Sequence, residues 1–243
     1  FLGDCREVLR GLPDNSVDSV VTDPPYELGF MGKSWDSSGI AYDVTVWAEC
    51  LRVLKPGGHI VAFGGSRTFH RLAVAVEDAG FEIRDTIAWI SSKTFPKSLN
   101  VEKAMNKAGM DGSLAAGWGT GLKQVVEPVV VGRKPFGKGV TVAENVLAWG
   151  VGGLNIDGSR IGTESRFSPP GGIPNGANNY VNTDKNRNAD YPSKMVQGRW
   201  PANVILDEVS AGLLDEQSGL TKSPKPYKAE GYKDSSMFGV GGV

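Results

Sequence analysis

The run VDSVVTDPPY (17–26) joins a short β-branched stretch directly to two prolines. Proline has a fixed φ and no backbone N–H, so a Pro-Pro pair ends a central strand and does not continue a helix. We therefore expect a buried strand that leaves its sheet at Asp23, with an acid and an aromatic residue at the exit. Taken alone, a Pro-Pro pair after a strand is typical of a simple turn.

The segments around this exit alternate between the patterns of helices and strands. Asp4 is the expected N-cap of a first helix, and Ser66 is the expected N-cap of a helix ended by Gly80. Gly57 and Gly58 are expected to form the C-cap turn that stops the helix before them. In chain order we expect helices over 4–12, 42–54 and 66–80, strands over 17–23, 59–65, 81–90 and 125–134, and a short strand and helix within 203–219.

This alternation predicts an α/β fold with a mostly parallel sheet flanked by helices, formed by residues 1–135. Such sheets bind ligands beyond the carboxyl ends of their strands. Because DPPY (23–26) and FGG (63–65) both follow strands, we expect a site at that edge. Residues 136–200 are rich in Gly, Asn, Ser and Pro, which predicts a loop-rich, mobile insertion, and residues 201–243 hold a short strand, a helix and an unassigned tail.

The composition excludes several classes of protein. No run of about 18 apolar residues is present, so no membrane span is expected. Two cysteines and two histidines at unrelated spacings indicate neither a disulfide scaffold nor a metal site, and they fit a reduced, cytoplasmic protein. Residues 1–65 hold 5 Lys/Arg against 9 Asp/Glu, whereas residues 91–135 hold 7 against 3. The basic segment is either a surface that binds a polyanion or an ordinary solvated face.

The residues of DPPY have a definite chemistry at a strand exit. The two prolines hold nearby carbonyl groups outward without an adjacent donor, and Asp23 adds a second acceptor. Two acceptors together suit an NH2 group, and Tyr26 offers a flat face for a planar ring. No serine, cysteine or histidine lies within residues 20–30, so a covalent nucleophile is not indicated. The pattern predicts a site that holds a planar amino compound while its nitrogen reacts with another molecule.

The stretches GDCREVLRGLPDNSVDSVVTDPPY, ECLRVLKPGGHIVAFGG and EPVVVGRKP resemble the DNA amino-methyltransferases of bacteria and phages, in the form whose catalytic motif comes first in the chain. The resemblance covers about residues 1–135 well, and a weaker likeness continues through TVAENVLAWGVGGLNIDGSRIGTESR and GRWPANVILD. It implies transfer of a methyl group from S-adenosylmethionine to an amino group of a flipped base. The implied catalytic residues are Asp23, Pro24, Pro25 and Tyr26: Tyr26 stacks on the base, and the Asp23 carboxylate and Pro24 carbonyl accept from its amino group.

The identity of the first motif residue separates relatives within this resemblance. An aspartate there favours adenine N6 as the target, and cytosine N4 is the alternative. Protein and RNA methyltransferases more often carry an asparagine at that position, which disfavours them here. A different class of function remains open, in which the chain is a DNA-binding remnant without catalytic activity.

The resemblance also implies S-adenosylmethionine as the cofactor, but its glycine-rich signature is not found in a suitable context. GWGTG (117–121), WGVGG (149–153) and MFGVGGV (237–243) lack the strand before or the helix after them. We therefore expect the chain to stop before that signature, with Asp4, Asp23 and Pro24 as the cofactor-binding residues that remain. For Asp4, a helix cap is the alternative role.

The expected partner is double-stranded DNA, joined by a cognate restriction enzyme where the protein is part of a restriction–modification system. SSKTFPKS (91–98) suits a loop that contacts phosphates and a base through Lys93, Phe95 and Lys97, although an ordinary surface loop has the same composition. Arg67 is a further candidate phosphate contact. Residues 136–200 correspond to the target-recognition region of the family, with candidates at Arg160, Arg166, Lys185, Arg187 and Arg199.

Overall fold

A computed structural model describes residues 1–29, 32–168 and 194–219 of the chain. Its main sheet has five strands, and β1 pairs with β2, and β3 with β7, in parallel. The strand β4 lies between β2 and β3 and is antiparallel to both. Four of the five strands thus run in one direction, which confirms the predicted α/β fold, whereas the reversal of the central strand was not predicted. The order is β1 (Val17–Thr22), β2 (Leu54–Phe63), β4 (Val126–Arg133), β3 (Glu82–Ile90) and β7 (Val204–Leu206).

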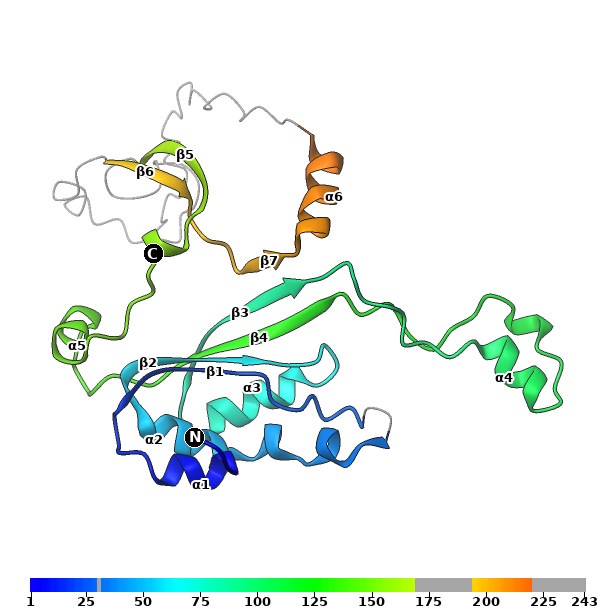
Figure 1. Cartoon of the computed structure of the whole chain (residues 1–243), viewed down its shortest axis with the longest axis horizontal. Coiled ribbons are helices and arrows are strands. Elements are labelled where there is room, and N and C mark those ends of the chain that lie inside the picture. Colours follow the sequence, from blue (N-terminus) through cyan, green and yellow to red (C-terminus); the bar gives the residue numbers. More distant parts are fainter. Residues whose placement is uncertain (30–31, 169–193, 220–243) are drawn as a thin grey trace, which may run out of the picture.

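Three helices lie together on one side of this sheet: α1 (Cys5–Arg10), α2 (Val44–Val53) and α3 (Phe69–Asp78) (Figure 1). Two of them have an aspartate as N-cap. Asp4 accepts from the Arg6 backbone N–H, and Asp43 accepts from that of Thr45. Apolar side chains of α2 and α3 pack against the sheet to form the core. The core residues are Trp47, Cys50, Leu54, Ile60, Ala62, Leu72, Ala75, Val76, Phe81 and Val130.

Two local expectations were wrong. The glycines of KPGG do not cap α2, because that helix ends at Val53 and β2 begins at the fully buried Leu54. Burial of Leu54 in the core fixes the extended conformation there, and Gly57 lies inside the strand with a φ of 82°. Ser66 does not cap α3 either, since the helix begins at Phe69 and residue 68 occupies the N-cap position without a side-chain hydrogen bond to the helix.

A long arm, residues 91–125, leaves the sheet between β3 and β4. Figure 1 shows the arm reaching far from the sheet, with α4 (Val101–Lys107) near its tip. Asn100 caps this helix by accepting from the Lys103 backbone N–H. The arm exposes large apolar side chains, at Phe95, Leu99, Met110, Leu114, Trp118 and Leu122.

The C-terminal part contains more regular structure than its composition predicts. It forms α5 (Val142–Trp149), the two-stranded sheet of β5 (Ile161–Ser168) and β6 (Lys194–Arg199), and α6 (Glu208–Ser218). The expected strand and helix within 203–219 are confirmed as β7 and α6, and β7 extends the main sheet at β3. Residues 169–193 of the predicted mobile insertion lie outside the described residues.

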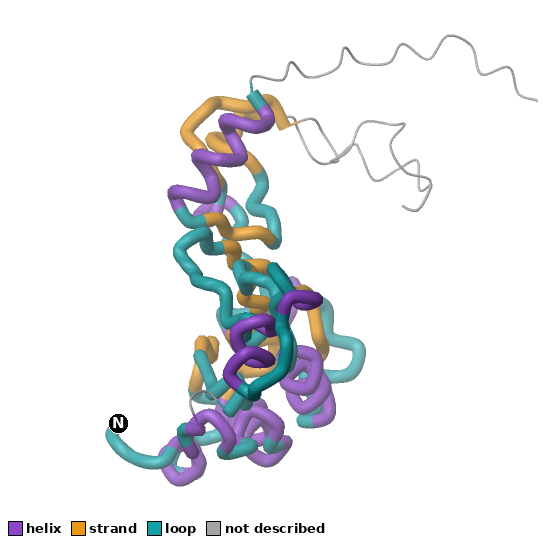
Figure 2. Tube along the Cα trace, turned by 90° about the vertical axis from the view of Figure 1, so that its right-hand side faces the viewer, coloured by secondary structure: helices purple, strands orange, loops and turns teal. Residues whose placement is uncertain are grey.

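Short 3-10 helices complete the described structure, at Ser34–Ser37, Ile40–Tyr42, Ser113–Ala115 and Asp157–Ser159. The view in Figure 2, turned by 90°, shows an elongated molecule whose N-terminus lies at an end rich in helices. Within the described ranges, no helix combines the length and the apolar character needed to cross a membrane.

Candidate functional site

The exits of β1 and β2 lie side by side at one edge of the sheet. These strands pair in parallel, with Thr22 opposite Ala62, so Asp23 and Gly64 leave the sheet at neighbouring positions. The sequence-based expectation that DPPY and FGG share this edge is therefore confirmed. A backbone hydrogen bond of 3.0 Å from Gly64 N to Pro128 O brings the start of β4 to the same place.

Tyr26 is held at this edge by the turn that precedes α3. The Thr68 hydroxyl donates to the Tyr26 carbonyl oxygen at 2.8 Å. A Cβ on Gly65 would lie 3.3 Å from Cδ2 of the Tyr26 ring, so the glycine lets the backbone approach the ring closely. This explains why Thr68 does not cap its own helix: its hydroxyl is engaged by the loop that carries the aromatic residue.

The loop after Tyr26 is organised by a buried acid. Asp36 is only 3% exposed, and its carboxylate accepts from the backbone N–H groups of Glu27 and Leu28 at 3.1 and 3.2 Å. Glu27 has a φ of 56° and itself accepts from Gly39 N at 2.9 Å. Buried carboxylates are retained when hydrogen bonds satisfy them, so Asp36 fixes the path of the chain directly behind Tyr26.

A cavity of about 290 Å³ lies against Tyr26. The base of the arm supplies most of its lining, and three of the residues predicted to contact DNA are among them. Two aromatic rings, two cations and one carboxylate share the cavity. The lining residues are Tyr26, Lys93, Thr94, Phe95, Lys97, Gln124 and Glu127.

Negatively charged carboxylates lie near the Tyr26 side chain. Partial burial raises the pKa of Tyr26, and the negative charges of Glu127 and Asp23 raise it further. The phenol is therefore neutral and keeps its hydrogen across the physiological pH range.

Sequence reasoning missed Glu127 and Gln124 as site residues. Gln124 is held at the cavity because its carbonyl oxygen accepts from the Thr94 hydroxyl at 2.6 Å. Both residues lie about a hundred positions after DPPY in the chain, and Glu127 resembles any acid within a strand. A signal was present in the sequence, since EPVVVGRK sets a charged residue and a proline directly before a continuous apolar run.

Several predicted residues do not line this cavity, namely Asp23, Pro24, Pro25, Arg67 and Asp4. Arg67 is exposed in the turn before α3 and does not line the cavity. Asp4 caps α1, and its carboxylate also pairs with the Arg6 guanidinium at 2.5 Å, which lowers the pKa of Asp4 to about 2. The helix-cap role of Asp4 is therefore present in the structure, and its cofactor role stays a prediction.

The candidates for target recognition are spread over a separate part of the chain. Arg160 donates to Asp157 at 2.8 Å and stacks over the Trp200 ring at 5.6 Å from its centroid. Arg166 and Arg199 belong to the paired strands β5 and β6. The remaining two candidates, Lys185 and Arg187, lie outside the described residues.

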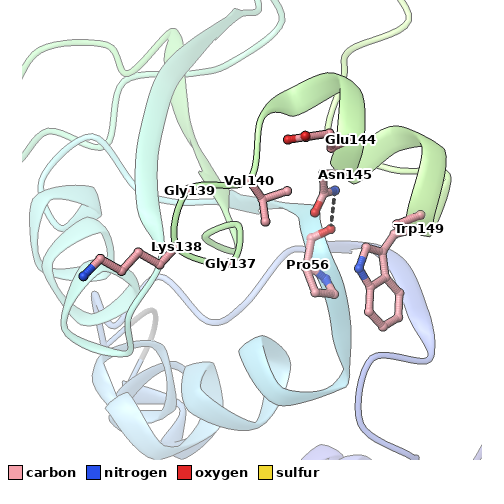
Figure 3. A pocket seen from close by; sticks show the side chains of 9 residues that line it. Pro56, Gly137, Lys138, Gly139, Val140, Glu144, Asn145 and Trp149 are labelled. Atoms are coloured by element: carbon pink, nitrogen blue, oxygen red, sulfur yellow. Dashed lines mark hydrogen bonds between the residues drawn. The ribbon is translucent and has the colours of Figure 1, made fainter.

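A larger cavity, of about 510 Å³, lies at the opposite end of β2 from Tyr26 (Figure 3). Asn145 on α5 is only 1% exposed there, and its side-chain amide donates to the carbonyl oxygens of Pro56 and Val151, each at 2.8 Å. Glu144 belongs to the capping box of α5 and accepts from Thr141 N at 2.8 Å. The bond from Asn145 to Pro56 attaches α5 to β2, so we assign the cavity a structural role.

The cavity at Tyr26 has the groups needed to hold a planar amino compound. Asp23, three residues before Tyr26 in the chain, is exposed and offers carboxylate oxygens, which accept from an NH2 group. Tyr26 and Phe95 supply aromatic surface for stacking, and Lys93 and Lys97 supply positive charge to the cavity lining. A planar, amino-bearing ring attached to an anionic group matches this arrangement.

Comparisons with known proteins point to one family. The family model described as DNA methylase matches residues 17–195 of this chain. The type II methyltransferase M.HindIII of Haemophilus influenzae is 28% identical over 149 residues, 60% of this chain and 45% of that protein. M.HinfI of the same species is 28% identical over 113 residues, 39% of this chain and 32% of that protein. The matched region thus spans less than half the length of these curated relatives.

Two solved structures are also similar. A DNA modification methylase of Thermus thermophilus, complexed with S-adenosyl-L-methionine, is 26% identical, with 60% of this chain and 57% of that chain covered at a TM-score of 0.39. The cytosine-N4-specific PvuII DNA methyltransferase is 18% identical, with 61% and 53% covered at a TM-score of 0.38. Each alignment covers little more than half of the other chain.

Proposed function

The chain belongs to the DNA methylase family, and on this basis we propose that it transfers a methyl group from S-adenosylmethionine to the exocyclic amino group of a base in double-stranded DNA, namely N6 of adenine. The observation that carries the proposal is the cavity beside Tyr26, which joins two aromatic rings and one carboxylate to two lysines. A flipped nucleotide has a planar amino-bearing base on an anionic backbone, so its chemistry matches that of the cavity.

Each residue of the motif has a defined part in this reaction. Tyr26 stacks on the flipped base, and Phe95 faces the same cavity. The Asp23 carboxylate and the Pro24 carbonyl accept hydrogen bonds from the amino group, which localises the lone pair on its nitrogen. Pro25 keeps this acceptor pair rigid because its φ is fixed. Asp23 is also placed to take the proton that the nitrogen loses after transfer.

S-adenosylmethionine supplies the methyl group when it is bound. The residues that we assign to it are Asp23, the Pro24 backbone and Asp4. Asp23 is exposed and leaves the sheet at a position neighbouring Gly64, because Thr22 pairs with Ala62. A negative carboxylate there suits a positively charged sulfonium group. Asp4 already pairs with Arg6, so its part in binding requires that this exposed ion pair opens.

The choice of adenine rests on the aspartate at the first position of the motif. The test is incubation of the chain with duplex DNA and isotopically labelled S-adenosylmethionine, followed by mass spectrometry of the nucleosides. Labelled N6-methyladenine is the expected product. N4-methylcytosine would move the target to cytosine. S-adenosylmethionine binding by calorimetry without any labelled nucleoside would contradict methyl transfer, and DNA binding without S-adenosylmethionine binding would identify a DNA-binding remnant.

Asp23→Ala is the variant that tests the motif directly. Loss of the acceptor removes a charge-assisted hydrogen bond to the reacting group, so we expect the rate of methyl transfer to fall by roughly 100-fold or more at an unchanged melting temperature. Asp18→Ala is the matched control, because Asp18 lies on the same strand and pairs with Lys55 away from the cavity. Wild-type turnover by Asp23→Ala would refute the catalytic assignment.

A further inference from the structure

The arm, residues 91–125, has a shape that its own hydrogen bonds fix. These bonds join the half that leaves the sheet to the half that returns, from the base of the arm to its tip (Figure 1). They are Ser91 N to Val125 O at 2.9 Å, Thr94 Oγ1 to Gln124 O at 2.6 Å, Thr120 N to Ser98 Oγ at 2.9 Å, Leu99 N to Thr120 Oγ1 at 3.0 Å and Val101 N to Trp118 O at 3.1 Å.

Large apolar side chains of this ordered arm are exposed. Leu122 is 93% exposed, Leu114 89% and Trp118 67%. The residues that the arm buries are small, namely Gly112 and Ala115 at its tip. Exposed apolar side chains gathered on one element mark a surface that another molecule covers.

The charge of the arm indicates the kind of molecule that fits this surface. Residues 91–125 hold 5 lysines and no arginine against 2 acids, a balance of +3. Lys103 and Lys107 are four residues apart on α4, so they lie on one side of that helix, and both are exposed. Lysine is depleted at the centres of protein–protein interfaces but is a common contact for phosphates. A polyanion therefore fits the arm better than a second protein does.

The base of the arm is also part of the cavity at Tyr26, because Lys93, Phe95 and Lys97 line it. When a base flips into this cavity, as the proposed function requires, the neighbouring duplex must pass the base of the arm. Residues 91–100 span at most about 35 Å when fully extended. One turn of B-DNA is about 34 Å long, so the arm can follow the flanking duplex for up to one turn.

We propose that the tip of the arm, formed by α4 and Trp118, binds the DNA duplex that flanks the target base. Lys103 and Lys107 contact phosphates, and Trp118, whose carbonyl oxygen accepts from Val101 N beside α4, supplies apolar contact in a groove. The inference rests on the proposed function and adds a second DNA-binding surface, apart from the cavity and from residues 136–200. Because phosphate contacts carry no sequence information, the arm contributes affinity and orientation rather than the choice of site.

The first test measures DNA affinity by fluorescence anisotropy at several salt concentrations. Lys103→Gln/Lys107→Gln should reduce the slope of log K against log salt concentration by roughly 2, as expected for two lost phosphate contacts. Arg10→Gln/Lys55→Gln is the matched control, since it removes the same charge from α1 and β2 and should keep the wild-type slope. A wild-type slope in the arm variant would overturn the proposal.

The second test separates the apolar contact from the charges. Trp118→Ala removes no charge, so it should weaken DNA binding roughly 5-fold or more at every salt concentration and leave the slope unchanged. The melting temperature should not change, because Trp118 is exposed. Val74→Ala, at a 53% exposed apolar residue on α3, should bind DNA like the wild type. Wild-type affinity in Trp118→Ala would remove this residue from the DNA contact and overturn that part of the proposal.

A second copy of the chain is the competing partner for the exposed apolar side chains. Sedimentation of the free protein tests it, and we expect Trp118→Ala and Leu114→Ala to have the same mass in solution as the wild type. A wild-type dimer that both substitutions dissociate, together with an unchanged DNA affinity, would assign the arm to self-association and overturn the proposal.

These measurements do not depend on methyl transfer, so the two proposals fail in different ways. A chain that binds DNA through the arm but methylates no base would refute the proposed function and leave the arm as a DNA-binding element. A chain that methylates DNA while Lys103→Gln/Lys107→Gln keeps the wild-type slope would overturn the role of the arm alone.

Discussion

At the scale of single residues, Tyr26 is fixed before any substrate is present. Thr68 holds its carbonyl group, Gly65 leaves room for its ring, and Asp36 orders the loop behind it. A side chain that is already placed loses little further conformational entropy when a base stacks on it. Thr68, Gly65 and Asp36 thus fix the position of Tyr26 for the stacking that we propose, although none of them takes part in the reaction.

Glycine at position 57 has a role at this scale that is separate from the site. Its φ is 82°, and a Cβ there would lie 2.5 Å from Nδ2 of Asn145 and 2.7 Å from Cε1 of Phe136. We expect Gly57→Ala to lower the free energy of unfolding by roughly 1–3 kcal/mol, through steric overlap and backbone strain together. Urea denaturation measures the change.

Gly139→Ala is the matched control for this substitution. Its φ of 79° is nearly the same, but no atom lies within 4 Å of the position that a Cβ would take. It therefore reports the backbone strain alone, which is roughly 1 kcal/mol. If both variants lost the same free energy of unfolding, Asn145 and Phe136 would move aside for the Cβ of residue 57 without a cost in stability.

At the scale of the elements, the paired strands β2 and β4 hold a histidine close to positively charged arginines. His59 on β2 lies opposite Arg133 on β4. Burial lowers the pKa of His59, and the positive charges of Arg133 and Arg84 lower it further. A histidine whose pKa is lower in the folded state than in the unfolded state contributes stability above its unfolded pKa of about 6.5, and this contribution is lost as the pH falls.

We therefore expect the urea midpoint to fall between pH 7.5 and pH 5.5, and to fall less in His59→Gln. The difference between the two proteins isolates the histidine from carboxylates that titrate in both. His70→Gln, at an exposed histidine on α3, should behave like the wild type. If the pH dependence were identical in all three proteins, the pKa of His59 would not be lowered in the folded state.

The elements also show what the sequence could predict. The strand β1, the helices α1 and α2 and the DPPY exit follow from local patterns, so they were predicted close to their observed positions. Glu127 was missed because it lines the same cavity as Tyr26 only through the pairing of β4 with β2, two strands that lie far apart in the sequence. The KPGG prediction was wrong for a related reason, since burial of Leu54 extends the strand past glycines that would otherwise form a turn.

At the scale of the whole molecule, the fold brings the basic segment of the chain (91–135) close to the acidic segment (1–65). The arm brings Lys93 and Lys97 to the cavity, so part of the basic middle segment lies beside the acidic first segment at Asp23. A DNA strand that enters the cavity, as we propose, would meet both lysines and the Glu127 carboxylate. The positive charge of the lysines would favour the approach of a phosphate backbone.

The affinity for duplex DNA should accordingly depend on salt through these lysines. Each phosphate contact contributes a slope of roughly −0.9 to log K against log salt concentration, so the double variant Lys93→Gln/Lys97→Gln should reduce the slope by roughly 2. Fluorescence anisotropy at several salt concentrations measures it. Lys55→Gln, at a lysine paired with Asp18 at the other end of β2, should keep the wild-type slope, and an unchanged slope in the double variant would refute the phosphate contacts.

The position of β4 between β2 and β3 also has a consequence for synthesis on the ribosome. Residues Leu54–Phe63 and Glu82–Ile90 are made first, yet the edge that each strand turns toward β4 has no partner until Val126–Arg133 has left the exit tunnel. The nascent chain thus carries two unpaired strand edges while the whole arm is translated, and such edges favour aggregation. Slow translation of the arm would prolong this exposure, whereas rapid translation would shorten the time before the sheet closes at its centre.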